Sequence, residues 1–169
     1  MSRRFADDFA AKERILVFEV NWIGDVLFST PAIRAIRKKH PGAFITVLVP
    51  PRCKPILTGN NFIDEVLVYD DKGIHRGPWG LLRLVRDLRV RHFSRAYFFK
   101  PSTTRLWCAI LAGIPERVGF TRKASFFLTQ KVAMPTGPSW HRADFFYYLV
   151  AKDRIPQSER HCDFFVSVE

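Results

Sequence analysis

The feature that most constrains the fold is a short apolar segment that is followed at once by a helical pattern. The segment, Arg14-Ile-Leu-Val-Phe-Glu-Val20, is rich in β-branched residues. It is too short for a helix and too continuously apolar for a half-exposed strand, so it predicts a buried parallel strand. After Gly24-Asp25, apolar residues recur at helical spacing as far as Pro41-Gly42, where the helix should stop. We expect Pro31 in the first turns of this helix, where the missing amide costs least.

The alternation of strand and helix continues along the chain. Further strands are predicted over Phe44–Val49, Val66–Tyr69 and Ala96–Phe99, with short strands around Val118–Phe120 and Lys131–Met134. Further helices are predicted over Cys53–Thr58, Trp79–Val90, Thr103–Ala112 and His141–Lys152. This order predicts an α/β fold, a Rossmann-like and mostly parallel sheet flanked by helices. Ligands of such sheets bind beyond the carboxyl ends of the strands, so the loops after the main strands form the expected functional edge.

Charge is concentrated in the middle of the chain. The 169 residues, which suit one domain, hold 27 Lys and Arg against 16 Asp and Glu, a net charge of +11. Residues 71–135 contribute 13 basic and 3 acidic residues, or +10, and no acidic residue occurs from Leu88 to Pro115. The basic side chains of residues 71–135 are either simply solvated or form a surface that binds phosphates, of nucleic acid or of lipid headgroups.

Composition also bears on location and on metal binding. No apolar run reaches the roughly 18 residues of a membrane-spanning helix, and acidic residues follow the amino-terminal arginines where a signal core would begin. The three cysteines are far apart and form no CxxC pair, so we expect a reducing compartment and no metal site. A cytoplasmic protein that touches a membrane from that side fits these features.

The most informative motif is Asn21-Trp22-Ile-Gly24-Asp25, which ends the first strand and opens the helix. Gly24 permits a tight turn and a close backbone approach. Asp25 is either a carboxylate favoured at a helix start or a general base that faces a cleft.

Several spaced motifs resemble one family. They are Trp22-Ile-Gly-Asp25, Ser29-Thr-Pro-Ala-Ile-Arg34, His40-Pro-Gly-Ala43, Ile63-Asp-Glu-Val66 and Ala112-Gly-Ile-Pro-Glu-Arg-Val-Gly-Phe120, with His141 opening a helix. Over about residues 14–152 the chain resembles glycosyltransferase family 9, the lipopolysaccharide heptosyltransferases, and is most like the heptosyltransferase II type.

The resemblance implies half of a GT-B enzyme, in which two Rossmann-like domains face each other across a cleft. Such enzymes transfer heptose from ADP-heptose to the inner core of lipopolysaccharide with inversion, without a cofactor or metal. We expect a flexible leader at 1–13, an acceptor-binding domain at 14–152 and the start of an interdomain linker at 153–169. The carboxy-terminal domain that binds the ADP-sugar is absent, so this chain alone should be inactive.

The resemblance also assigns roles to residues. Asp25 corresponds to the proposed catalytic base. The other residues are expected to bind the acceptor, whose Kdo carboxylates and lipid A phosphates match basic side chains at the functional edge; they are Asn21, Trp22, Gly24, Arg76, Lys100, Ser102, Arg122, Lys123 and His141. Each basic residue could equally be solvated, and His141 could be a helix cap. Trp22 either stacks on a sugar face or packs within the loop. Trp79, Leu81, Leu82 and Val85 form a stripe that either faces the sheet or dips into the surface of the inner membrane.

Two other functions remain as alternatives, a basic nucleic-acid-binding module and a nucleotide-binding α/β enzyme. Against the first, the chain has no RNP-like motif, helix-turn-helix pattern or zinc spacing, so no nucleic acid is expected. Against the second, it has neither GxGxxG after the first strand nor GxxxxGK[ST].

Overall fold

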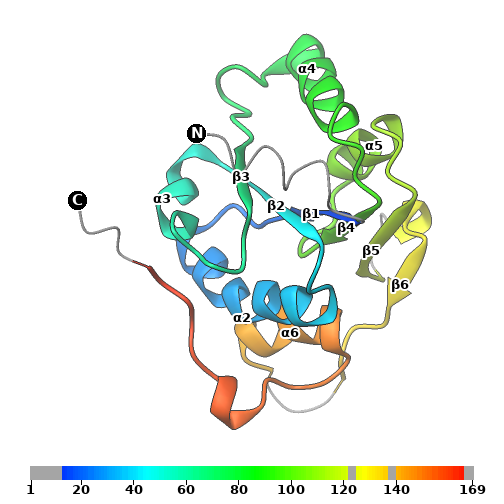
Figure 1. The fold of residues 1–169 in the computed structure, drawn as a ribbon. Coiled ribbons are helices and arrows are strands. Elements are labelled where there is room, and N and C mark those ends of the chain that lie inside the picture. The colour runs from blue at the N-terminus through cyan, green and yellow to red at the C-terminus, as the bar shows by residue number, and fades with distance from the viewer. Residues whose placement is uncertain (1–12, 122–124, 137–139, 166–169) are drawn as a thin grey trace.

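The computed structural model describes residues 13–121, 125–136 and 140–165. Six strands form one sheet in the order β3-β2-β1-β4-β5-β6, and every neighbouring pair is parallel (Figure 1). The strands are β1 (Arg14–Phe18), β2 (Phe44–Val49), β3 (Glu65–Val68), β4 (Arg95–Phe98), β5 (Glu116–Phe120) and β6 (Gln130–Val132). The chain builds outward from β1 to β3 and then crosses back to place β4 beside β1. The predicted Rossmann-like sheet is confirmed, and its order reverses between β1 and β4.

Burial of the central strand on both faces explains its unbroken apolar sequence. Ile15 and Val17 of β1 lie in one hydrophobic core, whereas Leu16 and Phe18 lie in the other. Successive side chains of a strand point to opposite faces, so one apolar run supplies both cores.

The helices divide between the two faces. Figure 1 shows α2 (Ile23–Lys39) beside α6 (Arg142–Ala151) on one face, and α4 (Gly77–Arg89) with α5 (Thr103–Leu111) on the other. The first core accordingly holds Ile33 and Phe146, and the second holds Leu88 and Leu106. The remaining short elements are η1 (Pro51–Cys53), α3 (Lys54–Leu57), η2 (Ser125–Phe127) and η3 (Gln157–Glu159).

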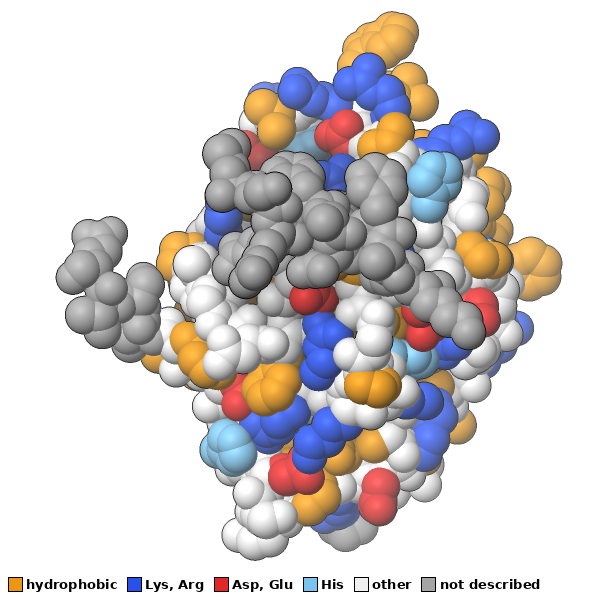
Figure 2. All heavy atoms as spheres, viewed as in Figure 1, with side chains coloured by type: hydrophobic (Ala, Val, Ile, Leu, Met, Phe, Trp, Pro, Cys, Tyr) orange, Lys and Arg blue, Asp and Glu red, His pale blue; other side chains and the backbone are white. Residues whose placement is uncertain are grey.

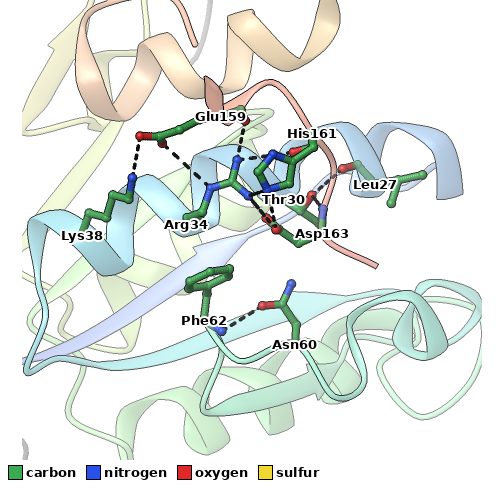
Figure 3. A network of polar contacts seen from close by, with 9 residues as sticks. All are labelled: Leu27, Thr30, Arg34, Lys38, Asn60, Phe62, Glu159, His161 and Asp163. Atoms are coloured by element: carbon green, nitrogen blue, oxygen red, sulfur yellow. Dashed lines mark hydrogen bonds and ion pairs between the residues drawn. The ribbon is translucent and has the colours of Figure 1, made fainter. Parts of the chain in front are cut away.

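The predicted position of Pro31 is wrong. Pro31 lies in the middle of α2, where its ring nitrogen cannot donate to the carbonyl of Leu27. The hydroxyl of Thr30 donates to that carbonyl instead, at 2.9 Å (Figure 3). This substitute hydrogen bond lets the helix continue through the proline.

The segment expected to begin a linker, 153–169, packs on α2 over part of its length (Figure 3). Arg34 of α2 is 5% exposed, and its Nη1 donates to both carboxylate oxygens of Asp163, at 2.6 and 2.7 Å. Its Nη2 donates to the carbonyl of Glu159, and Thr30 accepts from the amide of Asp163 at 2.8 Å. Because both charges are buried, this ion pair fixes the segment in one place.

The amino-terminal boundary is also fixed by charge. Glu13, the last residue of the expected flexible leader, bonds through one carboxylate oxygen to His40 at 2.7 Å and through the other to Arg95 at 3.2 Å. Residues 1–12 lie outside the described residues. Within the described ranges, no helix has the length and apolar character that crossing a bilayer requires.

Candidate functional site

The connection from β1 to α2 lies at the switch point and is held by arginines from two other elements. The carbonyl of Asn21 accepts from Nε of Arg52 at 3.0 Å, and Arg52 lies in η1, just after β2. The side-chain oxygen of Asn21 accepts from Nη2 of Arg105, and Nη1 of Arg105 donates to the carbonyl of Glu19. Arg105 belongs to α5, which follows β4. The two arginines therefore join the carboxyl ends of three neighbouring strands.

These contacts give Asn21 a role that the sequence did not suggest. Its two oxygens hold the loop together, and the acceptor contact expected for it stays a prediction. Sequence reasoning missed Arg52 and Arg105, although both stand at the start of an element that follows a strand. Position at the functional edge is the signal that could have singled them out.

Glu19 is a second residue that the sequence analysis passed over. Its side chain is fully buried under the loop, where Oε2 accepts from the amide of Val20 at 3.0 Å and Oε1 lies 2.6 Å from the hydroxyl of Ser29. Burial raises the pKa of Glu19 from 4.5 to about 8, despite the opposing effect of these two bonds.

The hydrogen bonding also favours a protonated Glu19. The hydroxyl of Ser29 lies 2.7 Å from the carbonyl of Val26, which can only accept. A hydroxyl has one hydrogen to donate, so if Ser29 donates it to the carbonyl of Val26, the hydroxyl oxygen is free to accept a hydrogen bond from a protonated Glu19. A neutral Glu19 satisfies both contacts.

Asp25 lies in the first turn of α2 and points out of the core. Its side chain is 21% exposed, and Oδ1 lies 3.2 Å from Nε of Arg142, the first residue of α6. No described residue bonds to Oδ2. Asp25 is therefore a partly exposed carboxylate that a cation holds from one side, which leaves an oxygen to accept a proton.

The two neighbours of Asp25 in the motif behave differently from each other. The ring of Trp22 is 70% exposed, with the guanidinium of Arg52 6.0 Å from its centre, so it does not pack within the loop. Gly24 lies in the helix, and a Cβ added to it meets nothing within 4 Å. The predicted tight turn at Gly24 is thus wrong, whereas its expected close approach to the acceptor stays a prediction. Its missing side chain instead leaves the start of α2 uncovered.

His141 is a helix cap, and its expected contact with the acceptor stays a prediction. Its Nδ1 accepts from the amide of Ala143 at 3.3 Å, which caps α6, and its ring stands edge-on to Phe28 at 5.2 Å. The same residue lines a hollow of about 220 Å³ between the middle of α2, the start of α6 and the carboxy-terminal segment. The hollow is lined by Phe28, Pro31, His141, Ala143, Asp144, Ile155, Arg160, His161 and Cys162. His141 and Ala143 line it on either side of Arg142 in the sequence, whereas Arg142 and Asp25 are not among its lining residues.

The basic residues expected to bind the acceptor are spread along the edge of the sheet. Arg76 is exposed at the start of α4, which follows β3, and Lys100 is exposed just after β4. These strands stand three positions apart, which corresponds to about 14 Å. Ser102 caps α5 by accepting from the amide of Arg105 at 3.3 Å. Arg122 and Lys123 lie outside the described residues.

A metal site has no support in the described part of the chain. There, no three His, Cys, Asp or Glu side chains gather in a way that could hold an ion.

Known proteins with similar sequences are glycosyltransferases. No protein-family model matches the chain. The chain is 26% identical over 144 residues to lipopolysaccharide heptosyltransferase 2 of Escherichia coli K12, and 24% identical over 144 residues to the enzyme of that name from Salmonella typhimurium. Each match covers 83% of this chain but only 40% of the relative.

Solved structures with a similar fold include glycosyltransferases as well. The family 9 glycosyltransferase of Veillonella parvula superposes with a TM-score of 0.80 at 21% identity, over 92% of this chain and 46% of that one. The E. coli ADP-heptose lipopolysaccharide heptosyltransferase II gives a TM-score of 0.68 at 22% identity, over 91% and 47%. The resemblance to glycosyltransferase family 9 is confirmed, and the chain spans less than half the length of these relatives.

Proposed function

We propose that this chain is the amino-terminal, acceptor-binding domain of an inverting glycosyltransferase of the GT-B type. In this proposal, the complete enzyme transfers heptose from ADP-heptose to the inner core of lipopolysaccharide at the cytoplasmic face of the inner membrane. The likeness to heptosyltransferases over 83% of the chain supports the reaction class. The share of the relatives that is covered, 40%, supports the view that the donor half lies elsewhere.

The observation that carries the proposal is the placement of Asp25. It stands at the switch point of the sheet, where α/β folds bind ligands, and its carboxylate faces outward rather than into the core. The arginine on α6 holds one oxygen, and the hollow beside His141 offers room for a sugar ring. A carboxylate held in this way can accept a proton from an acceptor hydroxyl that is brought to its second oxygen.

Inversion in one displacement requires such a group. The acceptor oxygen attacks the anomeric carbon from the side opposite the ADP, the bond to the diphosphate breaks, and Asp25 takes the proton of the attacking hydroxyl. A positioned general base contributes on the order of 10²–10⁴ in rate. In this proposal Arg142 acts as a positioning residue, because its Nε lies 3.2 Å from Oδ1 of Asp25 and leaves Oδ2 for the hydroxyl.

Binding to the isolated chain tests the assignment of the two substrates. In titration calorimetry we expect weak binding of a Kdo-lipid A fragment and hardly any binding of ADP-heptose. Tight ADP-heptose binding without acceptor affinity would reverse the assignment, and steep, salt-sensitive binding of an oligonucleotide would favour a nucleic-acid module instead.

Turnover tests Asp25 itself. In a two-domain protein that contains this chain, Asp25→Asn should lower kcat by on the order of 10²–10⁴ while the acceptor KM changes little. Thr104→Val, at an exposed position near the start of α5, serves as a control that should keep full turnover. Near-normal turnover of Asp25→Asn would remove this residue from the mechanism.

A further inference from the structure

The outer face of α4 differs from that of an ordinary surface helix. Its inner side packs on the sheet through Leu84, Val85 and Leu88, which are buried. On the opposite side Trp79 is 83% exposed and Leu82 is 55% exposed. The stripe that the sequence left undecided is therefore divided, with Val85 facing the sheet and Trp79 and Leu82 facing away from it.

The charged residues on this outer face all have the same sign. Arg83 and Arg86 follow Trp79 at helical spacing, Arg89 follows Leu82, and all three arginines are exposed. Their side chains have no ion-pair or hydrogen-bond partner among the described residues. The acidic residue of the helix, Asp87, is half-buried. We refer to Trp79, Leu82, Arg83, Arg86 and Arg89 as the outer face of α4.

The preceding loop fixes this face in a projecting position. His75 is buried, and its Nδ1 accepts from the amide of Asp70 at 3.0 Å, while Asp70 accepts from the amide of Gly73 at 3.0 Å. A Cβ on Gly80 would lie 2.2 Å from the backbone of His75, so the loop and the helix are in close contact. The loop also exposes Ile74, 59% accessible, next to the helix.

The projection is visible in the figures. Figure 1 shows α4 leading away from the sheet, on the side opposite α2 and α6. Figure 2 shows hydrophobic side chains and Lys or Arg side chains together at that end of the molecule. A convex end of this kind suits a flat partner better than a peptide or a sugar, which requires a groove.

We propose that the outer face of α4 docks on an anionic lipid bilayer. Trp79 and Leu82 enter the interfacial region, where tryptophan and apolar side chains are stabilised, and the three arginines lie against the lipid phosphates. The single sign of charge around exposed apolar residues is the observation that selects a lipid surface. This inference rests on the proposed function in one respect, because the proposed acceptor is anchored in a membrane and the enzyme must reach that membrane to act on it.

Vesicle co-sedimentation tests the docking face. The chain should bind vesicles of phosphatidylcholine with phosphatidylglycerol, and binding should weaken as salt is added, because surface charges are screened. Trp79→Ala should lower the affinity about tenfold. Arg83→Gln with Arg86→Gln should lower it about 25-fold, at about fivefold for each arginine.

Matched variants on other surfaces control for general effects. Lys54→Gln with Lys131→Gln removes the same charge from exposed sites, and Trp107→Ala removes a tryptophan that is 45% exposed on α5. Both controls should stay within about twofold of the unaltered chain. Equal losses in the controls, equal binding to pure phosphatidylcholine, or no binding to anionic vesicles would each overturn the inference.

The outcomes separate this inference from the proposed function. If the unaltered chain binds the detergent-dispersed acceptor fragment but does not bind anionic vesicles, only the proposed docking face is overturned. Vesicle binding without acceptor binding overturns the proposed function alone. If the chain instead forms a dimer that Trp79→Ala dissociates, and does not bind vesicles, a second copy of the chain covers this face and the inference is wrong.

Discussion

Replacing Glu19 by glutamine should make the protein more stable, and more so at higher pH. The folded protein buries the carboxyl and raises its pKa from 4.5 to about 8, so between these values the folded state holds a proton that the unfolded state has lost. Stability supplied by the neutral form is complete below pH 4.5 and is lost as pH rises toward 8. The free energy of unfolding falls by up to about 1.4 kcal/mol for each pH unit in this window, which amounts to about 2–4 kcal/mol between pH 5 and pH 8.

Glutamine imitates the protonated acid, because its amide group can donate to Ser29 while its oxygen accepts from the amide of Val20. Urea unfolding should therefore give similar free energies of unfolding for Glu19→Gln at pH 5 and at pH 8. The difference in that free energy between the variant and the unaltered chain should be about 2–4 kcal/mol larger at pH 8 than at pH 5. Glu116→Gln, at a surface position, serves as the matched control. A gap that stays constant across this range would show that Glu19 is not neutral in the folded protein.

Two further predictions concern the carboxy-terminal segment and α4. Arg34→Met leaves the buried carboxylate of Asp163 uncompensated, so it should cost about 3–5 kcal/mol in urea unfolding and expose the segment to proteases. The double variant Arg34→Met with Asp163→Leu should recover part of that loss, and no recovery would mean that the ion pair is not the cause. Gly80→Ala should destabilise the protein by about 1–3 kcal/mol, because the new Cβ meets the backbone of His75. In the same measurement, Gly42→Ala, where a Cβ meets nothing within 4 Å, should change the stability far less.

The fold could be predicted from the sequence because each strand carries its own local signal. The apolar run of β1 marks a strand buried on both faces, and the helical spacing after Asp25 marks α2. The position of Pro31 was predicted wrongly because its cost is removed by a neighbouring hydroxyl, that of Thr30. A helix-breaking residue can therefore sit inside a helix when a local side chain replaces the missing donor.

The site was only partly predictable, since its contacts join residues far apart in the chain. The motif placed Asp25 at the functional edge, but nothing near it in the sequence identifies Arg142 as its partner. Asn21 meets Arg105 from α5 because β4 lies beside β1, and that adjacency depends on the strand order. Glu19 was missed for a different reason. It lies within the apolar run Arg14–Val20, which predicts a buried strand and gives no sign of a functional carboxylate.

The net charge of +11 does not by itself measure the surface that is free for an anionic ligand. Arg52 and Arg105 donate to backbone carbonyls at the switch point, and Arg117 donates to the carbonyls of Phe127 and Ile114. An arginine bound to a carbonyl needs no acidic partner, so part of the excess is built into the fold. The exposed arginines of α4 bind no carbonyl or carboxylate among the described residues. Their charge, rather than the net charge of the whole chain, is therefore what supports an anionic partner.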